Sequence, residues 1–375
     1  MMVTILVFLL ILSVLVLIHE AGHFFVAKFF NIKIEEFGFG LPPRAFGKKW
    51  GETIYSINWL PIGGFVKLYG EDEAGSGKVS LSKTAQKTNV GKDESRAFYS
   101  RPVWQRALVV FAGVFMNFVF AVLIISILFS FIGVAIPGKE VIVDRIISGA
   151  PAQEAGLKQG DTIVSINSIK IESPDQLVIY TKKHLGENII LEVKDNKGTV
   201  KTIEITPRKT YPKGEGPMGV AISQSVVTKK YPIWEAPFVG TREVLNQSVL
   251  IGKGLVTVVF QLVTQGSVPK DVAGPVGIAQ LTGTVVEIGL PAVLSFVSLL
   301  SLNLAIINIL PIPALDGGRL LFILIEGVSG RKVSPRFETM AHTIGMAVLL
   351  GLIALITIHD LIRILSGQPL IPQIK

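Results

Sequence analysis

Two histidines and a glutamate lie close together near the N-terminus, in the run His19-Glu20-Ala21-Gly22-His23. On a helix, side chains four positions apart lie one above the other, so His19 and His23 can present both imidazoles to one metal ion. Glu20 lies on the flank of the same face, where a carboxylate can take a proton from water at the metal. The run therefore predicts a catalytic metal centre.

The residues around this motif strengthen the prediction. Residues 3–18 carry no charge, and residues 24–27 are apolar again. A stretch of this length can cross a bilayer as a helix. Ionisable side chains inside such a helix are costly to bury, so they usually serve a function. The run lacks a basic leader and a small-residue cleavage site, so we expect it to be retained rather than removed as a signal peptide.

The composition fits an integral membrane protein. Of the 375 residues, 49% are hydrophobic and 17% are charged, and there is no cysteine. The lack of cysteine excludes disulfides, cysteine nucleophiles and thiolate zinc ligands, so a metal must be held by nitrogen and oxygen atoms. The net charge of +8 fits attraction to an anionic lipid bilayer, and we expect no nucleic-acid partner.

Four stretches reach the roughly twenty apolar residues that a bilayer requires. They lie at residues 3–30, 107–136, 288–325 and 340–358, the third interrupted by Asp316. Basic residues cluster after the first stretch, before the second, and between the third and the fourth. The excess of lysine and arginine on the cytoplasmic side predicts that both termini face outward. The histidine motif then lies toward the cytoplasmic end of the first span.

Residues 34–69 predict strands and tight turns, because glycines and prolines interrupt a strand-like sequence. The segment is apolar for a cytoplasmic loop, and backbone at membrane depth must be paired or line a wet cavity. We expect a β-element that enters the membrane beside the metal. A small surface hairpin is the alternative. Residues 70–95 are polar and of mixed charge, which predicts a mobile loop.

Residues 141–225 alternate short strands with turns. A short helix ending at glycine (Ala155-Gly156-Leu157), a Gly160-Asp161 turn and an apolar strand follow one another, and this stretch resembles a PDZ domain. PDZ domains take an extended peptide onto a strand edge, often with its terminal carboxylate held by backbone amides. A spacer with the same fold that binds no peptide is the alternative.

Residues 234–265 contain four charges among apolar residues and are expected to be too polar to span the membrane. We expect them to lie along the outer membrane surface instead.

The predicted fold is thus an α-helical polytopic membrane protein with about four transmembrane helices, a membrane-associated β-element and an inserted PDZ-like α+β domain. The predicted segments are 1–33 (first transmembrane helix), 34–102 (β-element and loop), 103–136 (second helix), 137–228 (PDZ-like domain), 229–287 (amphipathic segment and linker), 288–328 (third region) and 337–365 (fourth helix).

A catalytic zinc site needs a third protein ligand. Asp316 is the only acid in the third hydrophobic region, and the topology puts it at the depth of the two histidines. Two prolines and two glycines around it break the helix, and unwound backbone at this depth belongs next to a polar cavity. Structural pairing of Asp316 with Arg319 is the alternative.

The remaining histidines are weaker candidates. His184 lies in the exterior domain, on the wrong side of the membrane for the motif. His342 and His359 lie in the fourth span and are interpreted as helix-end or packing residues.

The first-span motif, the PDZ-like insert and the late run Asn308 to Gly318 (Asn-Ile-Leu-Pro-Ile-Pro-Ala-Leu-Asp-Gly-Gly) resemble, in this order, the site-2 protease family of intramembrane zinc metalloproteases. The likeness is greatest to the bacterial regulator of sigma-E protease branch, in its version with one PDZ domain. The resemblance runs nearly from end to end of the chain.

The resemblance implies Zn²⁺ bound by His19, His23 and Asp316, with Glu20 as the catalytic acid and base. It implies that Asn308 and Pro311 help to position the substrate backbone. Residues 38–40 and 61–68 resemble the re-entrant β-element of the family, in which Gly63 and Gly64 are assigned to substrate binding. Many members carry Gly-Pro before x-x-Asn in the second span; here the sequence is Gly113-Val114-Phe115-Met116-Asn117, so the resemblance carries less weight at Asn117.

The expected function is cleavage of transmembrane segments in regulated intramembrane proteolysis. The resemblance implies transmembrane protein substrates such as anti-sigma factors or remnant signal peptides, in the bacterial cytoplasmic membrane with the PDZ-like domain outside. A membrane zinc transporter is one alternative, but the outer halves of the spans offer few polar groups beyond Asn117 and Asn303. A PDZ receptor without catalysis is another; Glu20, which such a receptor would not need, argues against it.

Overall fold

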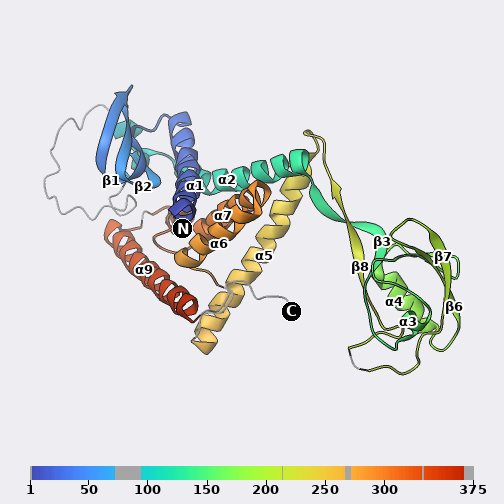
Figure 1. The fold of residues 1–375 in the computed structure, drawn as a ribbon. Helices are drawn as coiled ribbons and strands as arrows, with labels where there is room; N and C mark the ends of the chain where they lie inside the picture. Colours follow the sequence, from blue (N-terminus) through green and yellow to red (C-terminus); the bar gives the residue numbers. More distant parts are fainter. Residues whose placement is uncertain (1, 72–93, 213, 267–271, 332, 367–375) are drawn as a thin grey trace. The chain divides into compact units, whose positions relative to one another are not determined.

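The computed structural model describes residues 2–71, 94–212, 214–266, 272–331 and 333–366. The chain divides into two compact units: one contains the residues up to 132 and from 231 onward, and the other contains residues 133–230. The first unit is mostly helical and carries a β-hairpin, and the second is built on a sheet (Figure 1). Most of the loop predicted at residues 70–95 lies outside the described residues.

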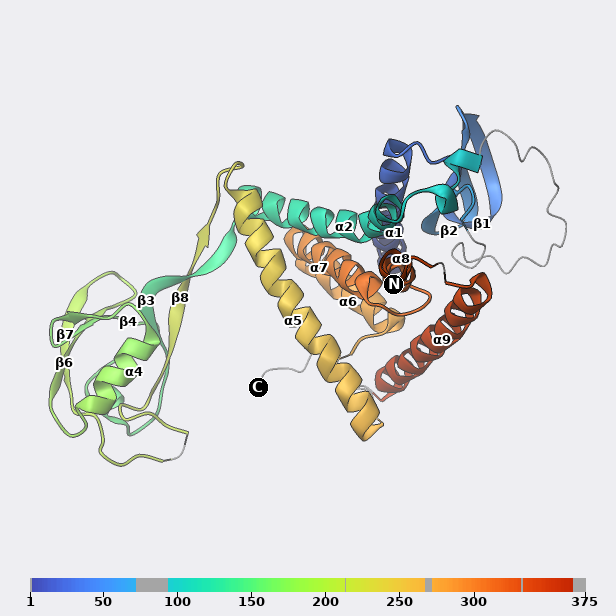
Figure 2. The ribbon, with the colours of Figure 1, turned by 180° about the vertical axis from the view of Figure 1, so that it is seen from behind.

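The α-helices of the helical unit, within the described residues, are labelled in Figures 1 and 2. They are α1 (Met2–Phe29), α2 (Val103–Ile127), α5 (Ala236–Gln265), α6 (Pro275–Ile288), α7 (Leu290–Ile309), α8 (Asp316–Ser329) and α9 (Pro335–Leu365). Short 3-10 helices at Glu94–Arg96 and Phe98–Ser100 precede α2, and a π-helix at Leu128–Ile132 follows it. The third predicted hydrophobic region is thus two helices, α7 and α8, joined by a loop.

Five helical stretches of the described chain are long and apolar enough to cross a membrane: Val3–Phe29, Val103–Ile132, Ala236–Leu262, Leu290–Ile309 and Arg336–Leu365. The prediction was about four, because residues 234–265 were expected to be too polar. Their charges gather at the start of α5, and Lys253 is the only charged residue from Val244 to Leu262. By length and composition α5 is therefore a fifth candidate span.

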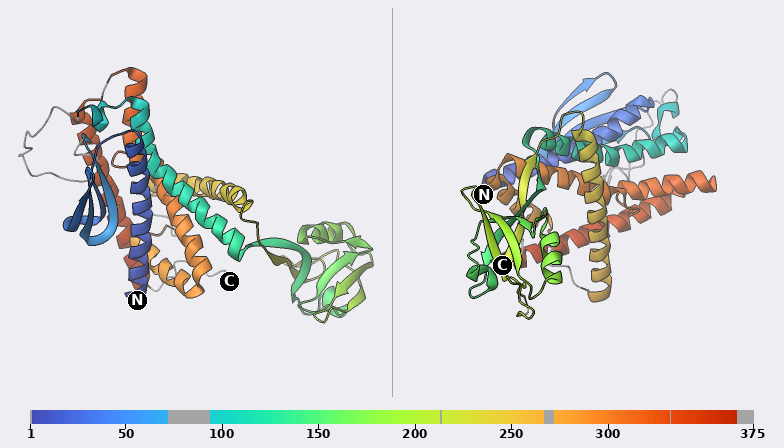
Figure 3. Two further views of the ribbon diagram at one scale, coloured as in Figure 1. Left: turned by 90° about the horizontal axis from the view of Figure 1, so that it is seen from above. Right: turned by 90° about the vertical axis from the view of Figure 1, so that its right-hand side faces the viewer.

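Helices α1 and α2 pack closely because glycine lies on both sides of their contact. A Cβ on Gly22 would lie 2.3 Å from the carbonyl oxygen of Ala112. On its other side α2 receives two hydrogen bonds from α7: the Ser298 hydroxyl donates to Ala121 O (3.1 Å) and the Ser301 hydroxyl donates to Asn117 O (2.8 Å). The close packing of α1, α2 and α7 is visible in Figures 1 and 2, and α1 runs beside α2 in the left view of Figure 3.

The β-element is a long hairpin of β1 (Ile34–Trp50) and β2 (Thr53–Leu68). Both strands fold back on themselves, so residues 36–39 pair with residues 64–67 on one side and with residues 54–57 on the other. Within the described chain, residues 64–67 pair on one side only and form an edge strand. The predicted strands are present, and their depth in the membrane remains a prediction.

The sheet unit contains six strands and two short helices. They are β3 (Val134–Ile146), α3 (Pro151–Glu154), β4 (Thr162–Ile166), β5 (Ile169–Lys170), α4 (Pro174–Lys183), β6 (Ile189–Lys194), β7 (Val200–Ile205) and β8 (Val220–Lys229). The strand order is β7-β6-β4-β3-β8, with β5 paired to β4. Alternate residues of β6 are buried, and they join an apolar core with residues of β3, β4 and α4.

Candidate metal centre

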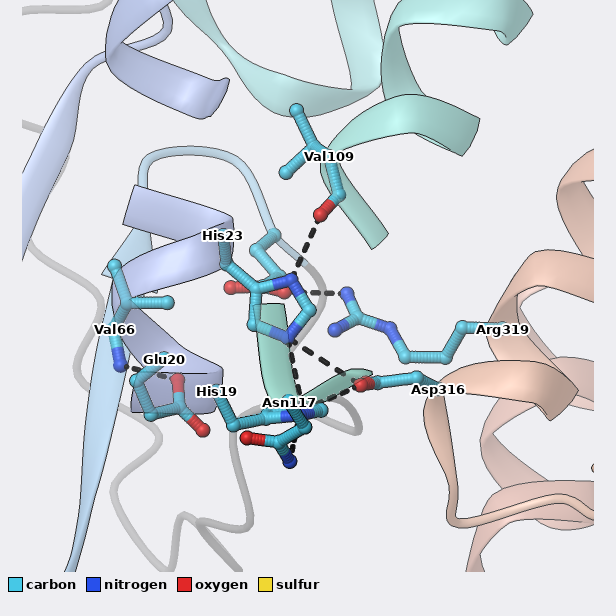
Figure 4. A network of polar contacts seen from close by, with 9 residues as sticks. His19, Glu20, His23, Val66, Val109, Asn117, Asp316 and Arg319 are labelled. Atoms are coloured by element: carbon cyan, nitrogen blue, oxygen red, sulfur yellow. Dashed lines mark hydrogen bonds and ion pairs between the residues drawn. The ribbon is translucent and has the colours of Figure 1, made fainter. Parts of the chain in front are cut away.

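The structure brings together the three predicted ligands, which come from α1 and from the start of α8 (Figure 4). His19 Nε2 lies 2.7 Å from Asp316 Oδ2, and His23 Nε2 lies 3.3 Å from the same oxygen. The two Nε2 atoms are 3.2 Å apart. Among the described residues these three form the one group of at least three histidine or acidic side chains with ligand atoms close enough to share a metal.

The geometry of the three side chains fits zinc. Tetrahedral zinc with bonds of about 2.0–2.1 Å to nitrogen and oxygen separates neighbouring ligand atoms by roughly 3.3 Å. The two longer separations in the site already match this value, and the shorter one requires only a small outward shift of Asp316. Two imidazoles and one carboxylate, with a fourth position left open, are the ligand set of a catalytic zinc site.

The orientation of His23 supports the same interpretation. His23 Nδ1 lies 2.8 Å from Val109 O, the backbone carbonyl of a residue on α2. A carbonyl oxygen can only accept, so Nδ1–H donates and the lone pair of Nε2 points at the site. Zinc-ligating histidines usually make this kind of second hydrogen bond.

Asn117 on α2 is the second hydrogen-bond partner of His19, as Val109 O is of His23. Its side chain is fully buried, and its Nδ2 lies 3.3 Å from His19 Nδ1. Asn117 Oδ1 has no hydrogen-bond partner in the described part of the chain. The two ends of an amide are assigned from their contacts, and turning the amide lets His19 Nδ1–H donate to Oδ1 while Nε2 faces the metal. Sequence reasoning gave Asn117 little weight, although a lone amide in an uncharged span was a signal.

Gly113 makes room for both imidazoles, and sequence reasoning missed this role. A Cβ at this position would lie 2.4 Å from His23 Nε2 and 2.8 Å from His19 Nε2. Any side chain on Gly113 would therefore occupy the space of the ligand atoms. The spacing of residues along α2 did not reveal this, because it depends on where α2 crosses α1.

Glu20 lies between the ligands and the hairpin. Its Oε2 accepts a hydrogen bond of 2.9 Å from the backbone N–H of Val66, in the edge strand (Figure 4). Glu20 also lines two cavities. The larger one, of about 610 Å³, is shared with His23, Asp316 and the edge strand, and the smaller one, of about 190 Å³, with His19, Asn117 and Asp316. A peptide bond in either cavity would lie beside the Glu20 carboxylate.

The four residues assigned to substrate binding separate into two pairs. Asn308 lines the smaller cavity, and Gly64 lines the larger one. Gly63 has φ +74° and faces Val16 of α1, the nearest atom to a Cβ there being Val16 Cγ1 at 3.5 Å. Pro311 is exposed and lines neither cavity. The structure thus places Asn308 and Gly64 at the site, Gly63 against α1, and Pro311 away from both cavities.

The loop of residues 310–315 turns the chain from α7 into α8. It packs directly on the first turn of α8, because a Cβ on Gly317 would lie 2.1 Å from Leu310 O and one on Gly318 would lie 2.4 Å from Ile312 O. Arg319 forms an ion pair with Glu71 instead of Asp316. Asp316 lies against the two histidines, which favours the predicted ligand role over a structural pair of Asp316 with Arg319.

Comparison with known proteins identifies the family. Residues 7–352 match the model of peptidase family M50. The zinc metalloprotease RasP of Shouchella clausii is 29% identical over 433 residues, which cover 97% of this chain and 100% of the relative. The regulator of sigma-W protease RasP of Bacillus subtilis is 30% identical over 425 residues, which cover 96% of this chain and 99% of the relative.

Among solved structures, the PDZ domain of an SdrC-like protein of Listeria monocytogenes matches 22% of this chain and 87% of its own, with 21% identity and a TM-score of 0.20. The several apolar helices fit a membrane protein of the matched family. The chain belongs to peptidase family M50, the site-2 protease family, and is a zinc metalloprotease.

Proposed function

We propose that His19, His23 and Asp316 hold the catalytic zinc and that Glu20 moves the protons of peptide-bond hydrolysis within a transmembrane substrate. The observation that carries this proposal is the meeting of three ligand atoms, from segments almost 300 residues apart, within 4.8 Å of one another. The Glu20 carboxylate lines the same two cavities as these ligands. A chemically idle metal site would have no use for it.

Zinc bound at this site supplies a Lewis acid that polarises the peptide carbonyl and acidifies water. Glu20 takes one proton from the water whose oxygen bonds to the carbonyl carbon. It then gives that proton to the amide nitrogen as the C–N bond breaks, so the products are a carboxylic acid and an amine. Asn308 lines the smaller cavity, and its side chain would hydrogen-bond the substrate backbone there.

The edge strand of the hairpin offers a place for the substrate. The peptide bonds of a transmembrane helix are hidden by their own hydrogen bonds, so the helix must unwind before cleavage. A strand edge can replace the lost bonds by pairing with the extended segment. The Val66 N–H points at Glu20 rather than into the hairpin, and Gly64 leaves the larger cavity open beside it.

The sheet unit supports a second, accessory role. Its outer strand β8 and helix α4 border a cavity of about 440 Å³, lined by apolar side chains such as Leu177 and Met218 and by residues 214–217. Such a groove suits an extended peptide with its terminal carboxylate on backbone amides. The unit would then sense a newly made C-terminus, or filter substrates by size, outside the cytoplasmic membrane.

The substrates that fit this proposal are single-span proteins already shortened outside the membrane. The Bacillus subtilis relative carries the name regulator of sigma-W protease, which supports anti-sigma factors as one class. Remnant signal peptides are the other class, because they too are short and span the membrane once. Either class meets the protease within the bacterial cytoplasmic membrane.

The variant Glu20→Gln tests the proposal, since it keeps the size of the side chain and removes its ability to accept a proton. We expect cleavage of a single-span model substrate by the purified protein to be lost, while zinc content measured by atomic absorption and substrate binding stay unchanged. Cleavage at the wild-type rate by the variant would refute the proposed role of Glu20. Zinc transport into protein-containing vesicles, unaffected by this change, would support the transporter instead.

A further inference from the structure

The third ligand is held differently from the other two. His19 and His23 are fixed by the regular backbone of α1, whereas Asp316 is the first residue of α8 and follows the irregular loop 310–315. The direction of its carboxylate therefore depends on what holds that loop in place.

Ala314, two residues before the ligand, has a backbone that needs outside support. Its φ is +85°, in the left-handed region that residues with a side chain rarely adopt. Such conformations persist where the surrounding structure enforces them, and they gather at functional sites. The N–H of Ala314 donates a 2.9 Å hydrogen bond to Nδ1 of His342, which lies on α9.

His342 is itself firmly placed. Its side chain is buried, and its ring meets the ring of Phe322 on α8 edge to face, with the centroids 5.7 Å apart. One turn further along α9, a Cβ on Gly345 would lie 2.2 Å from Pro313 O. Helix α9 thus contacts the loop at two consecutive residues, Pro313 by close backbone packing and Ala314 by a hydrogen bond.

We propose that His342 is a positioning residue: by accepting the Ala314 N–H, its imidazole holds the loop so that Asp316 points at the two histidines. The proton of this imidazole then resides on Nε2, since Nδ1 accepts. His342 is not among the grouped metal-ligand candidates of the described residues, so it would act through the loop. This role goes beyond the helix-end or packing role expected from the sequence, and it rests on the proposed metal site.

Three substitutions separate a positioning role from simple packing. In His342→Asn the side-chain oxygen is as many bonds from Cα as Nδ1, so it can accept the same N–H. In His342→Gln the oxygen is one bond further out, near the former Nε2. His342→Leu fills a similar space without any acceptor. The matched control is His359→Leu on the same helix, because within the described chain His359 Nδ1 makes no hydrogen bond.

Each full-length variant is purified in detergent, stripped of metal and titrated with zinc against a chelator. The visible absorption spectrum of the Co²⁺-loaded form reports the ligand geometry independently of activity. We expect His342→Leu and His342→Gln to bind zinc about 10–100-fold more weakly, as is typical for the loss of an outer partner of a metal site, and to alter the Co²⁺ spectrum. His342→Asn should restore most of the affinity and the wild-type spectrum, and His359→Leu should match wild type.

Equal zinc affinity and equal spectra for Asn and Gln would overturn the proposal, because the position of the acceptor would then be irrelevant. Wild-type behaviour of His342→Leu would overturn it as well. If His342→Leu fails to fold, the comparison of Asn with Gln still decides. If the wild-type protein binds no zinc, the proposed function itself is refuted. If all variants bind zinc as tightly as wild type, only the role of His342 is refuted.

Discussion

The helical unit and the sheet unit both contain an apolar core cluster, but they differ in what lies at their centres. The sheet unit has a core of apolar side chains such as Ile163, Leu177 and Leu191, each fully buried. The helical unit gathers buried polar groups around its centre, among them His19, His23 and the fully buried Asn117. When a contact is lost from an apolar core of this kind, the free energy of unfolding falls and nothing else changes. A centre of the second kind depends on exact spacing, so small changes should remove function before they unfold the chain.

The largest effect is expected from Gly113→Ala in the helical unit. The new methyl group would meet Nε2 of both His19 and His23 at less than 3 Å, so we expect zinc affinity to fall by about 100-fold or more, at the upper end of the losses that follow disruption of a zinc site. Zinc content after dialysis measures this. Gly252→Ala in α5, where a Cβ meets no described atom within 4 Å, is the control and should keep its zinc. A zinc-replete Gly113→Ala protein would show that the centre is roomier than the structure indicates.

Leu191→Ala should produce the opposite result in the sheet unit. Leu191 is fully buried in the apolar core, and such truncations cost about 2–5 kcal/mol of unfolding free energy. Calorimetry should show the sheet unit melting at a lower temperature while zinc content stays at the wild-type level. Ile190→Ala, next to it on β6 with 44% of the side chain exposed, should change little. If Leu191→Ala loses its zinc, the proposed difference between the units, stability in one and metal binding in the other, does not hold.

Asn117→Leu tests the contact between the Asn117 amide and His19, one of the two proposed metal ligands on α1. The substitution keeps the branched shape of the side chain and removes the amide beside His19 Nδ1. We expect zinc to bind about 10–100-fold more weakly, or about 1.4–2.7 kcal/mol, with little change in melting temperature. Asn303→Leu in α7, which lines neither of the two cavities at the centre, serves as the control. Equal zinc affinity for both variants would assign Asn117 to packing.

The smallest effect is expected at Asp195, on the surface of the sheet unit. The Lys201 ammonium, helped by the Thr199 N–H, lowers the pKa of Asp195 from the ordinary 3.8 to about 2. A lowered pKa stabilises the folded state above the ordinary value, and this contribution is lost as the pH falls from about 4 through about 2. The melting temperature of the sheet unit in Asp195→Asn should therefore fall less over that interval than in wild type. If the melting temperatures of wild type and variant fall in parallel with pH, the Asp195–Lys201 pair contributes nothing to the stability of the sheet unit.

The sequence predicted those parts of the fold and of the site that depend on residues close together in the chain. Four-residue spacing on a helix placed His19 and His23 together, and short strand-like runs between turn residues predicted the strands of the sheet unit. Asp316 was found because an acid is conspicuous in an apolar region. The roles of Gly113 and His342 depend instead on where helices distant in sequence meet, which no local pattern contains. Helix α5 was expected to be too polar to span because its charges were counted over the whole segment. Counted over its apolar stretch, α5 is a candidate span by length and composition.

Helices α2 and α8 are joined by an ion pair outside the metal centre: Arg106 Nη2 and Glu326 Oε1 lie 2.6 Å apart, with both side chains largely buried. This ion pair involves no proposed metal ligand, so it can hold α2 against α8 whether or not zinc is bound. We therefore expect the polypeptide to assemble first and to acquire its metal afterwards. A chelator should consequently yield an inactive but intact protein, and adding zinc back should restore its activity without any need for refolding.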